Sequence, residues 1–163
     1  MKKNDMKQQL LQLGNGAHAL ATQILGNTDD AADAVHDAFA RVLSKPDAYD
    51  ARTGGLKPWF LRVVRNGCID QIRRRRPADN AVDELQDQAP GPDVVVEVAQ
   101  RDRALQNALA KLSAGQREII VLRDYMDLSY AEIADVQEIA QGTVMSRLHR
   151  ARMALKEELT RHD

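Results

Sequence analysis

The segment that most constrains the fold is residues 128–152, LSYAEIADVQEIAQGTVMSRLHRAR. Ser129 is followed three residues later by Glu132, which is the spacing of a capping box at the start of a helix. After a break, Thr143 is predicted to cap a second helix. The apolar positions of the pair keep helical spacing and are expected to face inward: Ile133, Ala134, Val144, Leu148, Ala151, Leu155 and Leu159. The segment therefore predicts a helix-turn-helix.

The second of these helices carries its cations away from the apolar side, at Arg147, His149, Arg150 and Arg152. A helix that is apolar on one side and basic on the other can pack on its domain and lie in the major groove of DNA. A solvated basic helix in an ordinary bundle has the same pattern. The segment alone favours DNA binding and leaves that alternative open.

Composition indicates an all-α protein. The chain has 163 residues, 44% of them hydrophobic and only 4% aromatic, and lacks the alternating runs of a sheet protein. Its single cysteine, Cys68, excludes an internal disulfide framework and a CxxC zinc site. No apolar stretch approaches the ~20 residues of a membrane span, and no apolar signal core follows Lys2, Lys3 and Lys7. We expect a cytoplasmic protein without membrane insertion.

Charge is strongly segregated along the chain, although the net charge is only −1. Residues 52–76 contain eight basic side chains and one acid, whereas residues 77–102 contain seven acids and one base. Such blocks produce local electrostatic fields that the net charge of the whole chain does not reveal. The basic block therefore remains compatible with a nucleic-acid partner.

Helical patterns and breaks divide the chain into two small helical domains and a linker. Residues 1–76 are expected to form the first domain, in which one helix ends before Pro46 and another runs from about Pro58 to Arg75. Residues 77–96 are acidic, with Pro77, Pro90, Gly91 and Pro92, and predict a flexible linker. Residues 97–163 are expected to form the second domain, which contains the helix-turn-helix.

The helix near residues 58–75 combines aromatic and basic side chains. Bases of unpaired nucleic acid stack on aromatic rings while cations follow the phosphates, so this composition suits a single strand. The alternative is that the aromatic residues belong to the core. We expect that alternative to hold for Phe60, Val63 and Val64, and the pattern does not decide it for Trp59.

Taken together, these motifs resemble the extracytoplasmic-function group of bacterial RNA polymerase sigma factors of the sigma-70 family. Residues 32–43, ADAVHDAFARVL, are similar to the helix that binds the β′ clamp of the polymerase. Residues 57–75 resemble the segment that melts and reads the −10 element. Residues 105–134 and then 142–152 resemble the −35-binding domain. The order and spacing of these motifs are more specific than any one of them.

The resemblance implies two DNA-binding sites. The second domain would place its recognition helix in the −35 major groove, with contacts from Thr143, Met145, Ser146, Arg147, His149 and Arg150. Whether Arg147 and Arg150 read guanine edges or hold phosphates stays open. The first domain would melt the −10 element and capture its non-template strand through Lys57, Trp59, Arg62, Arg65, Asn66, Asp70, Arg73 and Arg74.

Within the −10 set, Asn66 is the best candidate for hydrogen bonding to a base edge. Trp59 would either wedge the duplex or anchor the loop from inside. The run of arginines that begins at Arg73 suits phosphates better than bases.

The resemblance also implies a polymerase-docking face on the helix near residues 32–43. Its members are Asp33, His36, Asp37, Phe39 and Arg41. A metal site at these residues is the less favoured interpretation, because a lone histidine with two aspartates on an exposed face is usually only solvated. The implied partners are core RNA polymerase, through its β′ clamp and β flap, promoter DNA and an anti-sigma factor. We expect no cofactor and no catalytic residue.

The chain departs from the family pattern at three places. Glu138 stands in the turn where many relatives have glycine, which costs on the order of 1 kcal/mol if the backbone there is left-handed. Met145 replaces a common lysine or arginine. Residues 1–25 resemble the family only weakly, which puts docking through that segment in doubt.

Three other classes of protein compete with this interpretation. A one-component regulator would need a ligand pocket or a dimer interface, which the small basic first domain does not suit. A decoy that captures anti-sigma factors usually carries a receiver domain. An enzyme would need a matched histidine for Cys68, paired carboxylates or a phosphate loop, and no such motif is found.

Overall fold

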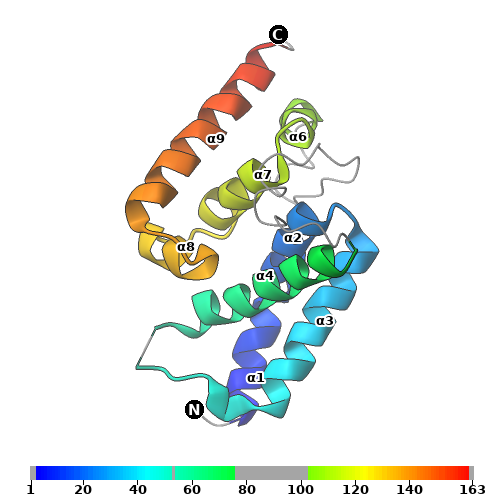
Figure 1. The fold of residues 1–163 in the computed structure, drawn as a ribbon, viewed down its shortest axis with the longest axis vertical. Coiled ribbons are helices and arrows are strands. Elements are labelled where there is room, and N and C mark those ends of the chain that lie inside the picture. The colour runs from blue at the N-terminus through cyan, green and yellow to red at the C-terminus, as the bar shows by residue number, and fades with distance from the viewer. Residues whose placement is uncertain (1–2, 53, 76–102, 162–163) are drawn as a thin grey trace.

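The computed structural model describes residues 3–52, 54–75 and 103–161 (Figure 1). All regular structure in these ranges is helical and they contain no strand, which confirms the all-α prediction. The predicted linker, residues 77–96, lies outside the described residues. We call residues 3–75 the N-terminal unit and residues 103–161 the C-terminal unit.

The N-terminal unit consists of α1 (Lys3–Gln12), α2 (Gly14–Leu25), α3 (Thr28–Ser44), the short 3₁₀ helix η1 (Pro46–Ala48) and α4 (Leu56–Arg75). Helix α3 begins where it does because the Asn27 side chain accepts hydrogen bonds from the backbone N–H groups of Asp29 and Asp30, at 2.8 and 3.0 Å. It ends at Ser44, one residue short of Lys45–Pro46, as the position of the proline predicts.

Helix α4 begins at Leu56, two residues earlier than predicted. Pro58 lies within its first turn, where the missing N–H has no partner in the helix and therefore costs nothing. Phe60, Leu61, Val64 and Cys68 are buried along one side of the helix. This packing holds α4 across α2 and α3. Arg73, Arg74 and Arg75 at its C-terminal end are exposed.

The C-terminal unit contains α6 (Arg103–Ala110), α7 (Ala114–Ile120), the π-helical turn η3 (Val121–Tyr125), α8 (Tyr130–Gln137) and α9 (Gln141–Arg161). Helix α7 starts with a capping box in which Ser113 and Gln116 exchange backbone-to-side-chain hydrogen bonds of 3.2 Å each. Helix α9 packs on both α7 and α8 around buried aliphatic side chains.

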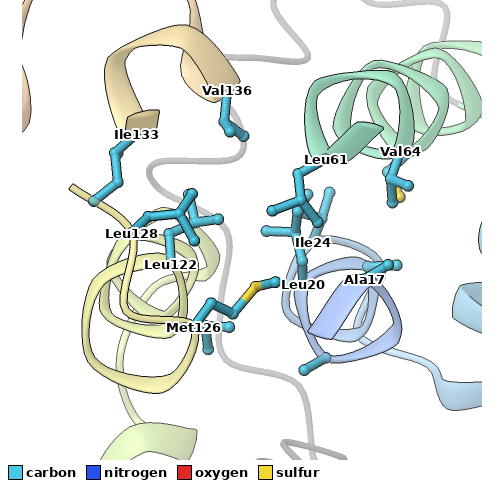
Figure 2. Packing of buried hydrophobic residues seen from close by; sticks show 14 of the residues in the cluster. Ala17, Leu20, Ile24, Leu61, Val64, Leu122, Met126, Leu128, Ile133 and Val136 are labelled. Atoms are coloured by element: carbon cyan, nitrogen blue, oxygen red, sulfur yellow. The ribbon is translucent and has the colours of Figure 1, made fainter. Parts of the chain in front are cut away.

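The two units pack directly on each other and share one continuous apolar core (Figure 2). Helix α4 lies against α8, and α2 lies against α7 and η3. The buried side chains that meet at this boundary include Leu20, Ile24, Leu61, Leu122, Leu128 and Val136. Sequence patterning predicted the helices but made no statement about this packing.

The turn between α8 and α9 has the left-handed residue that the glycine pattern of the family implied. Glu138 has φ 57° and ψ 47°, and its N–H donates to the carbonyl oxygen of Ala134. A Cβ is unfavourable in this region of backbone conformation because it crowds the neighbouring carbonyl oxygen.

We therefore expect E138G to be more stable to urea than E138A by about 1 kcal/mol. Both variants remove the same side-chain charge, and only the glycine variant relieves the backbone. Equal stability of the two variants would show that the turn carries no strain.

Candidate nucleic-acid interface

The predicted helix-turn-helix is formed by α8 and α9. Ser129 and Glu132 make the predicted capping box, with the Glu132 N–H donating to Ser129 Oγ at 3.1 Å and the Ser129 N–H donating to Glu132 Oε1 at 2.9 Å. Both bonds lie within four consecutive residues, so the local sequence fixes the start of α8 without help from the rest of the fold.

The prediction that Thr143 caps the second helix is wrong. Helix α9 already begins at Gln141, and the Val144 N–H donates to the carbonyl oxygen of Ala140 at 3.1 Å. Thr143 is therefore inside the first turn and half-buried. The tight turn at Glu138 lets the backbone resume helical geometry three residues sooner than a threonine cap at position 143 would.

The outward face of α9 carries the polar side chains that were predicted for the −35 site. Met145 is 55% exposed, and Ser146, His149 and Arg150 are exposed beside it. Arg147 is half-buried. The opposite side of the helix is closed by Val144, Leu148 and Ala151, which are buried. This division leaves one continuous polar face on the first three turns of α9.

Arg152, at the end of this face, differs from the other cations because it has an acidic partner. Its Nη2 donates to Asp124 Oδ1 at 2.6 Å, and this hydrogen bond raises the pKa of the guanidinium. Both side chains are about half exposed, so the pair contributes little to stability. It positions Arg152 toward η3 and away from the centre of the face.

Trp59 is half-buried in a small aromatic cluster at the start of α4. Its ring lies 5.1 Å from that of Tyr49, and the Tyr49 hydroxyl donates to the carbonyl oxygen of Gly54 at 2.8 Å. A hollow of about 90 Å³ opens beside the two rings, and its lining is Tyr49, Gly54, Gly55, Pro58, Trp59, Arg62 and Asp135. Phe60 and Val64 are both fully buried, whereas Val63 is half-buried and packs on the core.

The residues predicted for −10 contact do not all reach the same surface. Asp70, Arg73 and Arg74 are exposed along the outer part of α4, and Arg62 and Asn66 are half-buried. Two others point into the boundary with the C-terminal unit. Arg65 is 4% exposed and paired with Glu118, and Lys57 Nζ donates to the carbonyl oxygen of Met126 at 2.8 Å.

The predicted docking face lies on α3, on the side away from the core. Asp33, His36, Asp37 and Arg41 are exposed there. Phe39 is half-buried beneath them, with its ring 4.9 Å from that of Phe60. Among the described residues, no group of three or more histidine, cysteine or carboxylate side chains is arranged to hold a metal ion.

Sequence reasoning did not find Tyr49, Glu118, Asp135 and Gln137, which stand beside the candidate site residues. Tyr49 lies in the loop between η1 and α4 and has no helical periodicity to mark it. Glu118 and Asp135 come from the C-terminal unit and meet α4 only through the packing of the units. Gln137 joins them through its hydrogen bond to Glu118. A local pattern carries no signal for such contacts. Among the ranges that the structure covers, no helix is long and apolar enough to cross a membrane.

Comparisons with known proteins identify the class of this two-part helical fold. A family model described as sigma-70 region 2 matches residues 11–78, and another described as sigma-70, region 4, matches residues 102–155. The chain is 34% identical to the ECF RNA polymerase sigma factor SigE of Mycolicibacterium smegmatis over 93% of its length, and 32% identical to SigW of Bacillus subtilis over 87%. It spans 60% of the SigE chain and 82% of the SigW chain.

Solved structures agree with these matches. The sigma factor RpoE from Bartonella quintana, in complex with the anti-sigma factor NepR, superposes with a TM-score of 0.73 and 30% identity over 96% of this chain and 97% of that one. CnrH, solved with the cytosolic domain of CnrY, shares the fold with a TM-score of 0.67 at 22% identity, over 99% of this chain and 92% of that one. The chain belongs to the extracytoplasmic-function group of the sigma-70 family. Sigma factors of this family act in promoter-directed transcription and are not enzymes.

Proposed function

We propose that this protein directs core RNA polymerase to a set of promoters by reading the −35 duplex with α9 and capturing the melted −10 strand with α4. The observation that carries the proposal is the polar face of α9, which a helix-turn-helix presents outward while the opposite side of the helix is buried. The same chain also carries the aromatic and basic helix α4, so it has one candidate binding site for each promoter element.

At the −35 element, the first turns of α9 would enter the major groove. Thr143, Met145 and Ser146 stand at the start of the helix, followed by Arg147, His149 and Arg150. Arginine can donate two hydrogen bonds to the O6 and N7 atoms of a guanine or hold a phosphate. Met145 brings an apolar surface, which suits the methyl group of thymine.

At the −10 element, α4 would bind the non-template strand as the duplex opens. Removing a base from its stack costs a few kcal/mol, and aromatic surfaces and hydrogen bonds to the unstacked base offset that cost. Trp59 and Tyr49 supply the aromatic surface, and Asn66 supplies amide donors and acceptors for a base edge. Arg62, Arg73 and Arg74 would follow the phosphates, with Lys57, Arg65 and Asp70 as further contacts of this site.

The partners follow from the same proposal. Core polymerase would dock on Asp33, His36, Asp37, Phe39 and Arg41 through its β′ clamp and on the C-terminal unit through its β flap. The protein would therefore act in the cytoplasm, where the polymerase is found. An anti-sigma factor is a further proposed partner, which the likeness to RpoE in its complex with NepR supports.

The test is transcription in vitro from genomic fragments by bacterial core polymerase, with and without the protein. We expect discrete start sites that arise only with the protein, and alignment of these starts would give the −35 and −10 elements. Binding to core polymerase without new starts would point to a decoy. No binding to core would point to a separate DNA-binding regulator.

Met145 provides a sharper prediction for the −35 site. In M145R, a cation replaces an exposed apolar side chain within a basic face, so general DNA affinity should rise. The slope of log K against log salt should steepen by about 0.9, the contribution of one phosphate. The measurement is duplex binding at several salt concentrations, together with a ranking of promoters by transcription.

The control is M153R, which adds the same charge at a 52% exposed position two turns further along α9. It should leave the promoter ranking unchanged. An unaltered salt slope and an unaltered ranking in M145R would remove Met145 from the interface.

A further inference from the structure

The methionine sulfur atoms of the described chain differ sharply in their access to solvent. Met6 and Met126 are buried, with 1% and 8% of their surface exposed. Met145 and Met153 are 55% and 52% exposed, and both lie on α9. Among the methionines that the structure describes, the two on α9 are therefore the ones that an oxidant in solution reaches.

The single cysteine, which would otherwise compete for an oxidant, is withheld from solvent. Cys68 is 0% exposed, and burial raises the pKa of its thiol to about 12. The thiolate is the form of cysteine that oxidants attack, and very little of it is present at neutral pH when the pKa is so high. Among the described sulfur atoms, oxidation of the folded chain therefore begins on α9.

Met145 differs from Met153 in its place along this helix. It stands on the outward polar face, next to Ser146 and one turn before His149, whereas Met153 lies two turns further along. A long side chain in a helix covers the turn that precedes its own Cα. In that turn Gly142 has no side chain, and a Cβ there would meet nothing within 4 Å. The thioether of Met145 is therefore uncovered on the surface that we assign to the −35 groove.

We propose that Met145 is a site of reversible oxidation, and that its sulfoxide changes which base α9 prefers at one pair of the −35 element. This inference rests on the proposed function, because it concerns the groove face of α9. A peroxide transfers one oxygen atom to the thioether: the O–O bond breaks, an S–O bond forms, and the second oxygen leaves as water. The sulfur loses two electrons and the peroxide gains them.

The reverse step needs a dithiol reductant and a methionine sulfoxide reductase. The two thiols become a disulfide, the sulfoxide oxygen leaves as water, and the thioether returns. Oxidation at Met145 can therefore be undone without new synthesis of the chain.

The thioether and the sulfoxide suit different bases. The thioether is apolar and packs well on the C5-methyl group of thymine. The sulfoxide oxygen accepts hydrogen bonds, which suits the N4 amino group of cytosine, whereas the O4 atom of thymine is an acceptor and repels it. Oxidation should therefore lower the preference for thymine over cytosine at one base pair and leave unchanged the pairs that other side chains read.

The first measurement is peptide mass spectrometry of the folded full-length chain during treatment with hydrogen peroxide. Met145 and Met153 should each gain one oxygen, while Met6, Met126 and Cys68 stay unmodified until the chain is unfolded in urea. Circular dichroism checks that the treated chain keeps its helices. Oxidation of the buried methionines as fast as Met145 would overturn the assignment of the site.

The second measurement is transcription by core polymerase from a promoter found by start-site alignment, with its −35 element randomised. The chain is used untreated or oxidised, and catalase removes the peroxide before polymerase and DNA are added. The ratio of thymine to cytosine at one position should fall by about fivefold, the low end of what one base pair contributes to specificity. Methionine sulfoxide reductase with dithiothreitol should restore the ratio.

The variants M145L and M153L separate the two exposed sulfur atoms. Each replaces a thioether by an apolar side chain that peroxide does not oxidise, and each is compared with its own untreated form. M153L should respond to peroxide as wild type does, and M145L should not respond. A response that survives in M145L, or that is lost in M153L, would assign the effect to another group and overturn the inference.

The two possible failures give different results. An unchanged base preference in the oxidised chain, with normal transcription, would reject the effect of oxidation at Met145 and leave the proposed function intact. No transcription from any fragment with the untreated chain would reject the function, and the effect on base preference with it. The pattern of oxidation is measured in either case, because it needs neither polymerase nor DNA.

Discussion

F60A should lower the free energy of unfolding by about 3–5 kcal/mol, the usual loss when a buried phenylalanine is truncated to alanine. Phe60 is 0% exposed, and its ring is 4.9 Å from that of Phe39, so no water reaches the space that the ring would leave. The measurement is urea denaturation followed by circular dichroism. F60L should lose only about 1 kcal/mol, because it keeps most of the volume.

Trp59, the residue before Phe60, should affect activity more than stability. Trp59 is half-buried, so W59A should cost less stability than F60A. Under the proposed function the ring acts on the opening strand, so W59A should instead reduce transcription from duplex promoters and recover on templates that are already melted at −10. A large loss of stability in W59A with equal activity on both templates would make Trp59 a structural residue only.

Cys68 should be about a thousandfold less reactive toward iodoacetamide at pH 8 than an ordinary thiol. Burial, reinforced by the negative charge of Glu118 and partly opposed by Arg65, raises the pKa of its thiol from 9.0 to about 12. Since only the thiolate reacts, its population at pH 8 falls by about the same factor. The comparison is C68A/S44C, which moves the thiol to an exposed position on α3, with the unfolded wild-type chain as reference.

The same raised pKa predicts how stability depends on pH. The folded chain holds the Cys68 proton more tightly than the unfolded chain does. The contribution of this group is therefore complete below about pH 9 and is lost as the pH rises toward 12. C68A should show a smaller loss of stability across that range, and equal losses in C68A and wild type would assign the effect to other groups.

Sequence patterns located the helices well where the signals are local. The proline at position 46 and the Ser129–Glu132 spacing both fix helix ends through effects within a few residues. The error at Thr143 arose because the start of α9 depends on the conformation of the turn at Glu138 rather than on a side-chain cap.

The candidate site was predictable only in part, because some of its contacts form between helices that are far apart in the sequence. Helical spacing separates the exposed side of α9 from its buried side, and the outward positions of His149 and Arg150 followed from it. On α4 the same reasoning could not distinguish Arg65 from the exposed cations of the −10 set. The pairing of Arg65 with Glu118 depends on how two distant helices dock, and neither residue differs in its local pattern from a solvated charge.

The polar contacts between the units also set an order of events during synthesis. They join residues that are 53, 69 and 94 positions apart, whereas each capping box spans three. At 5–20 residues per second, a ribosome needs about 3–10 s to proceed from Arg65 to Glu118. During that interval the nascent N-terminal unit has its interface side uncovered, with Leu20 and Leu61 accessible.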